Sequence, residues 1–113
     1  MIAQVPHTYA VLGFQMNEHQ VAIGETTFTG REELWNKSTG YLEYWHFMSL
    51  ALQRAKTARE AVEVITGLAE EYGYGSEGES FSICDPDEAW ILEMVGQGDG
   101  VKGAIWVAIK IPD

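Results

Sequence analysis

The residues best suited to chemistry lie in one short stretch near the N-terminus. Met16-Asn17-Glu18-His19 forms a polar corner between two apolar segments, as in a β-hairpin. Acyl-transfer reactions need hydrogen-bond donors aimed at a developing oxyanion, and an Asn amide held at a strand end supplies one. The pattern therefore makes Asn17 the best candidate for an oxyanion donor. The residues leave a second interpretation open, in which Asn17 bonds its own backbone in a turn.

Three residues that follow this corner are candidates for binding a substrate. Glu25 and Thr26 come after the second apolar segment, where a carboxylate is suited to pairing with an α-amine. Arg31 carries a planar guanidinium that matches a carboxylate. A plainer alternative stays open for both charged residues. Glu25 would then be a solvated strand end, and Arg31 would form a surface ion pair with Glu32 or Glu33.

The sequence shows no nucleophile next to a base. Cys84 is the only cysteine, and it stands on an expected strand beside Asp85 and close to Asp87, whose charges disfavour a thiolate. We expect a buried structural cysteine there. His19 has the chemistry of a general base, but no nucleophile adjoins it, so we expect an exposed turn residue. The histidines and the cysteine show no metal-ligand spacing, and no metal or cofactor is predicted.

Length and charge restrict the kind of protein. The 113 residues suffice for one domain, and 46% of them are hydrophobic, as in a folded globular chain. The formal net charge of -10 argues against binding to nucleic acids or to anionic membrane surfaces. No segment has the length and apolarity of a membrane span, and residues 1–6 lack the charged start of a signal peptide. The sequence leaves the location open, with the cytoplasm as the default.

Apolar periodicity predicts strands, then two helices, then strands. Strands are expected at Thr8–Phe14, Val21–Phe28 (with a bulge or a close backbone approach at Gly24), 80–84, 90–95 and 104–111. The first helix is expected at Tyr41–Ala55 and is apolar almost all round, so other elements should cover it on more than one side. A capping box of Thr57 and Glu60 starts the second helix, and Gly73 ends it. Residues 1–113 are thus predicted to be a single α+β domain with an antiparallel sheet and two helices.

Four segments together resemble the cysteine dipeptidases of the N-terminal-nucleophile hydrolase superfamily. They read NEHQVAIGETTFTGREEL, LALQRAKTAREAVEVITGLAEEYGYGSEGESFSI, WILEMVG and KGAIWVAIKIPD. The resemblance runs in order over nearly the whole chain. It implies that the chain contributes one sheet-and-helices half of a four-layer αββα sandwich. It also implies a complete enzyme that cleaves small peptides through an acyl-enzyme intermediate, with Asn17 of the Met-Asn-Glu corner in the oxyanion hole.

The nucleophile that the resemblance implies is missing from this sequence. In the family it is an N-terminal cysteine made by processing, whereas this chain opens Met1-Ile2-Ala3-Gln4. We therefore expect an internal segment of a dipeptidase that is inactive by itself and forms a homo-oligomer through its uncovered apolar surface. One alternative is a non-catalytic oligomerising module derived from that fold. Another is a hydrolase that uses Glu18 and Glu25 as paired carboxylates.

Overall fold

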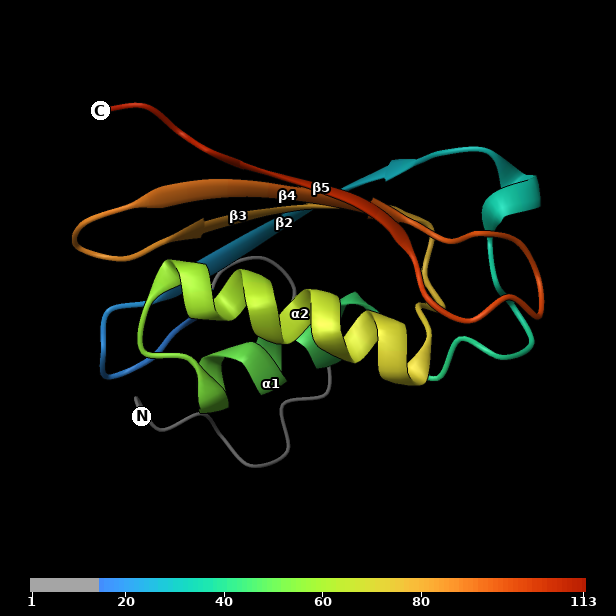
Figure 1. The fold of residues 1–113 in the computed structure, drawn as a ribbon, viewed down its shortest axis with the longest axis horizontal. Helices are drawn as coiled ribbons and strands as arrows, with labels where there is room; N and C mark the ends of the chain where they lie inside the picture. Colours follow the sequence, from blue (N-terminus) through green and yellow to red (C-terminus); the bar gives the residue numbers. More distant parts are fainter. Residues whose placement is uncertain (1–14) are drawn as a thin grey trace.

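The computed structural model describes residues 15–113. Five strands form one antiparallel sheet in the order β1-β2-β3-β4-β5. Along the chain, the helices come after β2 and before β3. Figure 1 shows that α1 and α2 cover one face of this sheet. The predicted α+β class with an antiparallel sheet and two helices is confirmed. The strand predicted at Thr8–Phe14 lies outside the described residues.

The bounds of the elements follow the prediction closely. The strands are β1 (Gln15–Met16), β2 (Ala22–Thr29), β3 (Gly78–Cys84), β4 (Ala89–Val95) and β5 (Ile105–Lys110). The helices are the 3-10 helix η1 (Glu32–Leu34), α1 (Tyr44–Arg54) and α2 (Ala58–Tyr72). Neither alternative for Gly24 is found, because it pairs regularly with Ser82 and, apart from its chain neighbours, no described atom lies within 4 Å of the place where a Cβ would be. The register shifts between Thr27 and Thr29 instead, where the chain is about to leave the sheet.

Local signals in the sequence set both ends of α2. The Thr57 Oγ1 accepts a hydrogen bond from the Glu60 N–H at 3.1 Å, as an N-cap should. The Glu60 carboxylate accepts from the Lys56 N–H at 2.7 Å, one residue earlier than a standard capping box would place that bond. Gly73 ends the helix with a φ of 82°, a backbone angle that favours glycine.

The α1 helix begins three residues later than predicted. Glu43 precedes it in extended conformation, and the Glu43 N–H donates to the His46 Nδ1 at 2.9 Å. The side chains that α1 buries completely or nearly so are Phe47, Met48, Ala51 and Leu52. Most of its other side chains are half-buried, in keeping with the prediction that this helix is covered on more than one side. None of the helices between residues 15 and 113 is long and apolar enough to cross a membrane.

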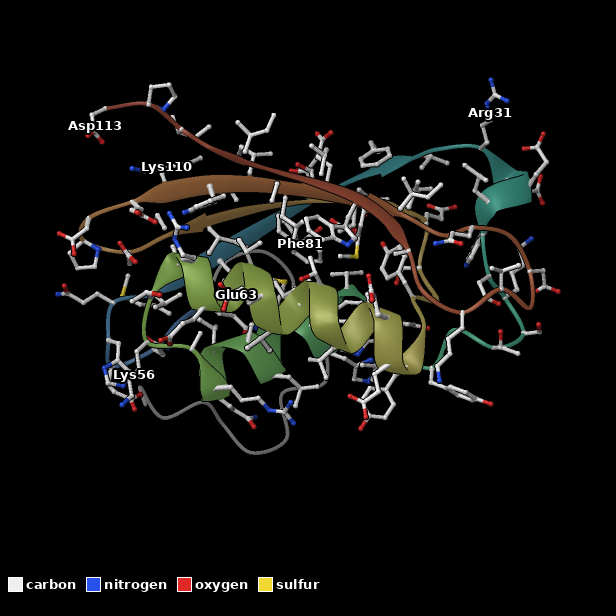
Figure 2. The ribbon with its side chains drawn as sticks, in the orientation of Figure 1. Arg31, Lys56, Glu63, Phe81, Lys110 and Asp113 are labelled. Atoms are coloured by element: carbon white, nitrogen blue, oxygen red, sulfur yellow. The ribbon has the colours of Figure 1, made fainter. Side chains whose placement is uncertain are left out.

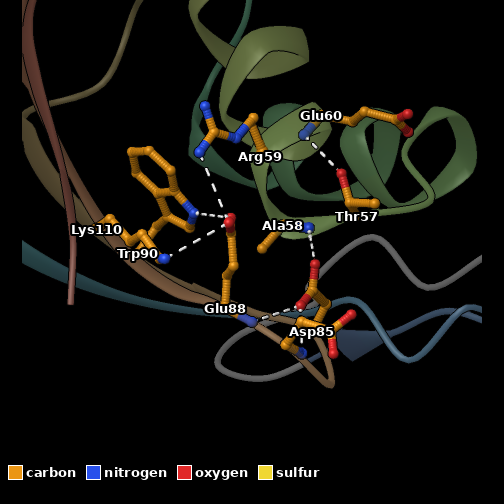
Figure 3. Close-up of polar contacts among 9 residues, drawn as sticks. Thr57, Ala58, Arg59, Glu60, Asp85, Glu88, Trp90 and Lys110 are labelled. Carbon is orange, nitrogen blue, oxygen red and sulfur yellow. Dashed lines mark hydrogen bonds and ion pairs between the residues drawn. The ribbon is translucent and has the colours of Figure 1, made fainter. Parts of the chain in front are cut away.

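The turn between β3 and β4 fastens the start of α2 to the sheet (Figure 3). The Asp85 Oδ2 accepts from the Ala58 N–H at 2.7 Å, which is one of the N–H groups that a helix start leaves unpaired. Next to it, the Glu88 carboxylate accepts from the Trp90 indole at 2.9 Å and lies 3.6 Å from the Arg59 guanidinium. These contacts fix the angle at which α2 lies across the sheet.

Strand alternation divides the sheet into a helix-covered face and an open face. On the covered face Phe81, Ile83, Leu92 and Met94 are buried against the helices, and Figure 2 shows Phe81 between the sheet and α2. On the open face large apolar side chains stay exposed among the described residues, with Ile109 at 56% exposure. The core therefore lies on one side of the sheet.

Candidate functional site

The polar corner near the N-terminus is a tight turn between β1 and β2. The Asn17 N–H donates to the Val21 carbonyl at 3.0 Å, and the Gln20 N–H donates to the Asn17 carbonyl at 3.1 Å. The left-handed backbone angle falls on Gln20, with a φ of 62°, and not on Asn17. The predicted hairpin is confirmed, and Asn17 is the residue at which the chain enters the turn.

The Asn17 side chain is buried, with 1% of its surface exposed. Its Nδ2 donates to the carbonyl oxygens of Leu52 and Ala55 at 2.9 Å and 2.8 Å. Its Oδ1 accepts from the N–H groups of His19 and Val21 at 2.9 Å and 3.1 Å. Because the last carbonyls of a helix lack partners within the helix, Asn17 both shapes the turn and closes the C-terminal end of α1.

These four bonds match the turn-forming interpretation of Asn17. An Asn amide has two hydrogens, and both are donated to α1. In this arrangement no amide hydrogen is left for an oxyanion. The oxyanion role stays a prediction, and it requires the contact between Asn17 and α1 to rearrange.

The predicted substrate-binding residues lie on different parts of the molecule. Glu25 is half-buried on the helix-covered face, near Glu79, whereas its neighbour Thr26 is exposed on the open face. Arg31 lies beyond the end of β2, and its side chain points away from the sheet in Figure 2. The sequence analysis offered Arg31 an ion pair with Glu32 as the alternative to substrate binding. In the structure the Glu32 carboxylate pairs with the Lys37 ammonium, at 3.2 Å. The arrangement does not bring Glu25, Thr26 and Arg31 around one ligand.

A recess of about 290 Å³ lies close to Glu25, between the sheet, the start of α1 and the loop 73–78. Its lining residues are Thr27, Trp35, Glu43, Tyr44, Gly75, Ser76, Glu77 and Glu79. Three hydrogen bonds hold the loop in place. The Trp35 indole donates to the Gly75 carbonyl at 2.8 Å, the Tyr44 N–H to the Ser76 Oγ at 3.2 Å, and the Gly75 N–H to the Leu42 carbonyl at 2.8 Å. A Cβ on Gly75 would come within 2.3 Å of the Gly40 carbonyl oxygen, so only glycine allows this approach.

Glu79 is the fully buried acidic group of this recess. Its Oε2 accepts from the Thr27 hydroxyl at 2.9 Å, and no described residue donates a hydrogen bond to its Oε1, which has the Glu25 carboxyl group as a neighbour. Burial raises the pKa of Glu79 to about 8, and the neighbouring Glu25 adds to the rise. The alternative of a hydrolase with paired carboxylates needs Glu18 and Glu25 close together. In the structure Glu25 lies next to Glu79 instead, and the Glu18 carboxylate lies 3.7 Å from the ring nitrogen of His19 on the exposed turn.

Comparison with known sequences places the chain in a family. The sequence profile of peptidase family C69 matches residues 2–113. The chain belongs to this family. A dipeptidase from Bifidobacterium longum (strain NCC 2705) is 41% identical over 68 residues, which are 59% of this chain and 11% of that protein. A probable dipeptidase from Latilactobacillus sakei is 37% identical over 65 residues, which are 58% of this chain and 12% of that protein.

The segments that match this chain span only about a tenth of the length of these two relatives. The predicted family is confirmed, and at the family level the chain belongs to a group of peptide hydrolases. In the described part of this C69 chain, no group of three or more His, Cys, Asp or Glu side chains is arranged to hold a metal ion.

The cysteine of this C69 chain lies at the end of β3, on the open face. Cys84 pairs with Ala22 on one side and with Ala89 on the other. It is exposed, so the expectation of a buried cysteine is wrong, because the open face has no covering element among residues 15–113. Its side chain makes no hydrogen bond to another described residue, so none of residues 15–113 is in place as a base to activate it.

The sequence analysis missed a buried Asn that organises the loops near the recess. The Asn36 Nδ2 donates to the Val101 carbonyl at 3.0 Å, and its Oδ1 accepts from the N–H groups of Thr39 and Gly100 at 3.1 Å and 2.9 Å. Asn36 thereby ties the segment after η1 to the loop between β4 and β5. The local sequence carries no signal for this role, since the partners are as many as 65 residues away.

Proposed function

We propose that this chain is a segment of a dipeptidase, which hydrolyses dipeptide amide bonds through an acyl-enzyme intermediate of the N-terminal-nucleophile type. The observation that carries the proposal is the match of residues 2–113 to peptidase family C69. The names of the two relatives support dipeptides as the substrate class.

Acyl transfer needs a nucleophile, a base within hydrogen-bond reach and an oxyanion donor in one place. Within the proposal, Cys84 is not the nucleophile, because it lacks a base and follows a chain that blocks its α-amine. Asn17 is the candidate donor if the complete enzyme frees its amide from α1. Otherwise Asn17 acts by holding the hairpin against that helix. Glu25, Thr26 and Arg31 stay candidates for contacts with the peptide.

The test exchanges equivalent segments between relatives. The 68-residue segment of the Bifidobacterium longum dipeptidase that matches this chain is replaced by the corresponding residues of the chain. We expect the chimera to hydrolyse dipeptides, because segments with 41% identity share their backbone and differ mainly in side-chain packing. A chimera with an unchanged melting temperature and no hydrolysis would contradict the proposal. The same exchange with the segment in reversed sequence order is the negative control.

The open face of the sheet favours a second candidate, a non-catalytic module that assembles with copies of itself. Its exposed apolar side chains are Phe28, Ile105, Val107, Ile109 and Ile111. Within the first proposal, the second sheet of the αββα sandwich would cover this face; within the second, another copy of the chain would do so. Hydrolysis of dipeptides by the chimera favours the dipeptidase segment. A stable homo-oligomer of the chain, together with an inactive chimera, favours the non-catalytic module.

A further inference from the structure

The recess beside α1 has the chemistry of a binding site, and of the residues that the dipeptidase proposal assigns to the peptide only Glu25 lies near it. Three of its eight lining residues are glutamates, and Glu25 lies close by on the same face of the sheet. None of the lining residues is basic. The Tyr44 N–H at the start of α1 is already bonded to Ser76, so it is not available to hold an anion. The local field therefore favours a cation.

One acceptor in this recess lacks a partner. The Glu79 carboxyl group is fully buried, and no described residue donates a hydrogen bond to its Oε1, since the neighbouring Glu25 offers another carboxyl group. A buried carboxylate oxygen without a donor is costly, and nearly all such groups in folded proteins have one. A ligand that supplies an N–H donor at this point would remove that cost.

The shape and composition of the recess select the kind of cation. The described acidic residues are not arranged as ligands of a metal ion, which needs several oxygens at one short distance. An ammonium group is larger and donates three hydrogen bonds in different directions, which suits separate acceptors. Tyr44 adds an aromatic ring to the wall, and aromatic faces attract organic cations; the Trp35 ring already has the Lys37 ammonium 4.7 Å from its centre.

We propose that this recess binds a primary ammonium group, with Glu79 as the principal acceptor and Glu43 as a second anionic partner. The group can be the α-amine of a peptide or the side-chain amine of a lysine, since both present the same chemistry. The proposal is independent of the dipeptidase function, because it concerns the helix-covered face and needs no nucleophile.

Calorimetric titration of the 113-residue chain with n-butylammonium tests the proposal. We expect saturable binding with a Kd of about a millimolar, as for one small group held by a few contacts. Binding should release up to about one proton at pH 7, because a cation beside Glu79 lowers a pKa that is otherwise about 8. The released protons are counted by repeating the titration in buffers of different ionisation enthalpy.

Variants identify the residues that hold the ligand. Glu79→Gln should weaken binding by about tenfold or more and abolish the proton release, because it removes a charged acceptor. Glu43→Gln provides a second measurement and should weaken binding several-fold. The control is Glu63→Gln on the solvent side of α2, which makes the same change of charge outside the recess and should leave the Kd unchanged.

Further ligands identify the chemistry and its source. Tetramethylammonium carries the same charge but no N–H donor, and we expect it to bind at least tenfold more weakly. Alaninamide presents an α-amine and Nα-acetyl-lysinamide a side-chain amine. The compound that binds with the lower Kd shows whether the natural ligand is a peptide α-amine or a lysine side chain. The proposal would be overturned if butylammonium showed no saturable binding, if Glu79→Gln bound it equally well, or if calcium bound more tightly than any amine.

Discussion

Asn17 and Ala55 are joined by a 2.8 Å hydrogen bond that spans 38 residues of sequence. The bond runs from the amide of the hairpin turn to a carbonyl at the end of α1. A second bond from the same amide reaches Leu52. The hairpin, α1 and the link to α2 are thus held together at one buried side chain, which makes Asn17 a structural residue whatever else it does.

Replacing Asn17 by Ala should lower the free energy of unfolding by about 2 to 4 kcal/mol, because four backbone groups lose a hydrogen bond, and three of these bonds are buried. Denaturant unfolding of the chain measures the loss. Asn17→Asp keeps the acceptor and loses both donors, so it should be destabilised as well. A change below about 0.5 kcal/mol in both variants would contradict the structural role.

The same substitution separates this role from catalysis in a dipeptidase chimera whose exchanged segment includes Asn17. If Asn17 donates to the oxyanion, Asn17→Ala should cut turnover by about a hundred- to a thousand-fold. A loss of turnover with an unchanged melting temperature would support the oxyanion role. Turnover and melting temperature falling together would support the structural role.

Glu79 should make the chain less stable as the pH rises. Its pKa is raised to about 8 in the folded chain, so the folded state keeps a proton that the unfolded state has already released. Stability should therefore fall by at most about 1.4 kcal/mol per pH unit from about pH 5 to about pH 8. Glu79→Gln should remove this slope, match the wild type near pH 5 and exceed it at pH 8. Parallel pH profiles of the two proteins would contradict the assignment.

Asp85 should act in the opposite direction and at lower pH. Burial opposes its ionisation, but N–H donors from Ala58, Asp87 and Glu88 outweigh burial and lower the Asp85 pKa. Its contribution is present above the usual aspartate pKa and is lost as the pH falls through the lowered value. Asp85→Asn should cost about 1 kcal/mol at neutral pH and flatten the acid side of the stability profile. Asp87→Asn is the matched control, and an equal effect in that exposed residue would argue against the prediction.

The elements were predictable because their signals are local. The Thr57 cap, the Gly73 helix end and the alternation of β5 each depend on residues within one turn or one strand. The contacts of Asn17, Asn36 and Asp85 reach 27 to 65 residues along the chain, and no local pattern encodes such partners.

The burial of Glu79, in contrast, could have been predicted from the sequence alone. Residues alternate along a strand, and Glu79 has the same parity as Phe81 and Ile83, which are buried in the core. Extending that alternation two residues toward the N-terminus places Glu79 on the core side. The paired strand shows the same pattern, because Glu25 follows the buried Ile23 by two residues.

The isolated chain should not hydrolyse dipeptides. Under the proposed mechanism the nucleophile is not Cys84, which has no base beside it among residues 15–113, and an active site that lacks its nucleophile typically loses about a million-fold in turnover. Cys84→Ala should leave any trace rate unchanged in a sensitive assay of released amino acids. Hydrolysis that thiol reagents block and Cys84→Ala abolishes would make Cys84 the nucleophile and overturn the proposed mechanism.

The chain should assemble through the open face of its sheet. Ile105, Val107 and Ile109 share that face of β5, and at 50% to 56% exposure they form an apolar surface that water disfavours. No strand of the described residues pairs with the outer edge of β5, so its backbone groups can also extend the sheet.

Light scattering at micromolar concentration should give a mass above that of one chain. Ile109→Lys should shift the population to monomer, whereas Glu63→Lys on the far side of α2 should not. A wild-type chain that is monomeric at these concentrations would show that the exposed face does not drive association.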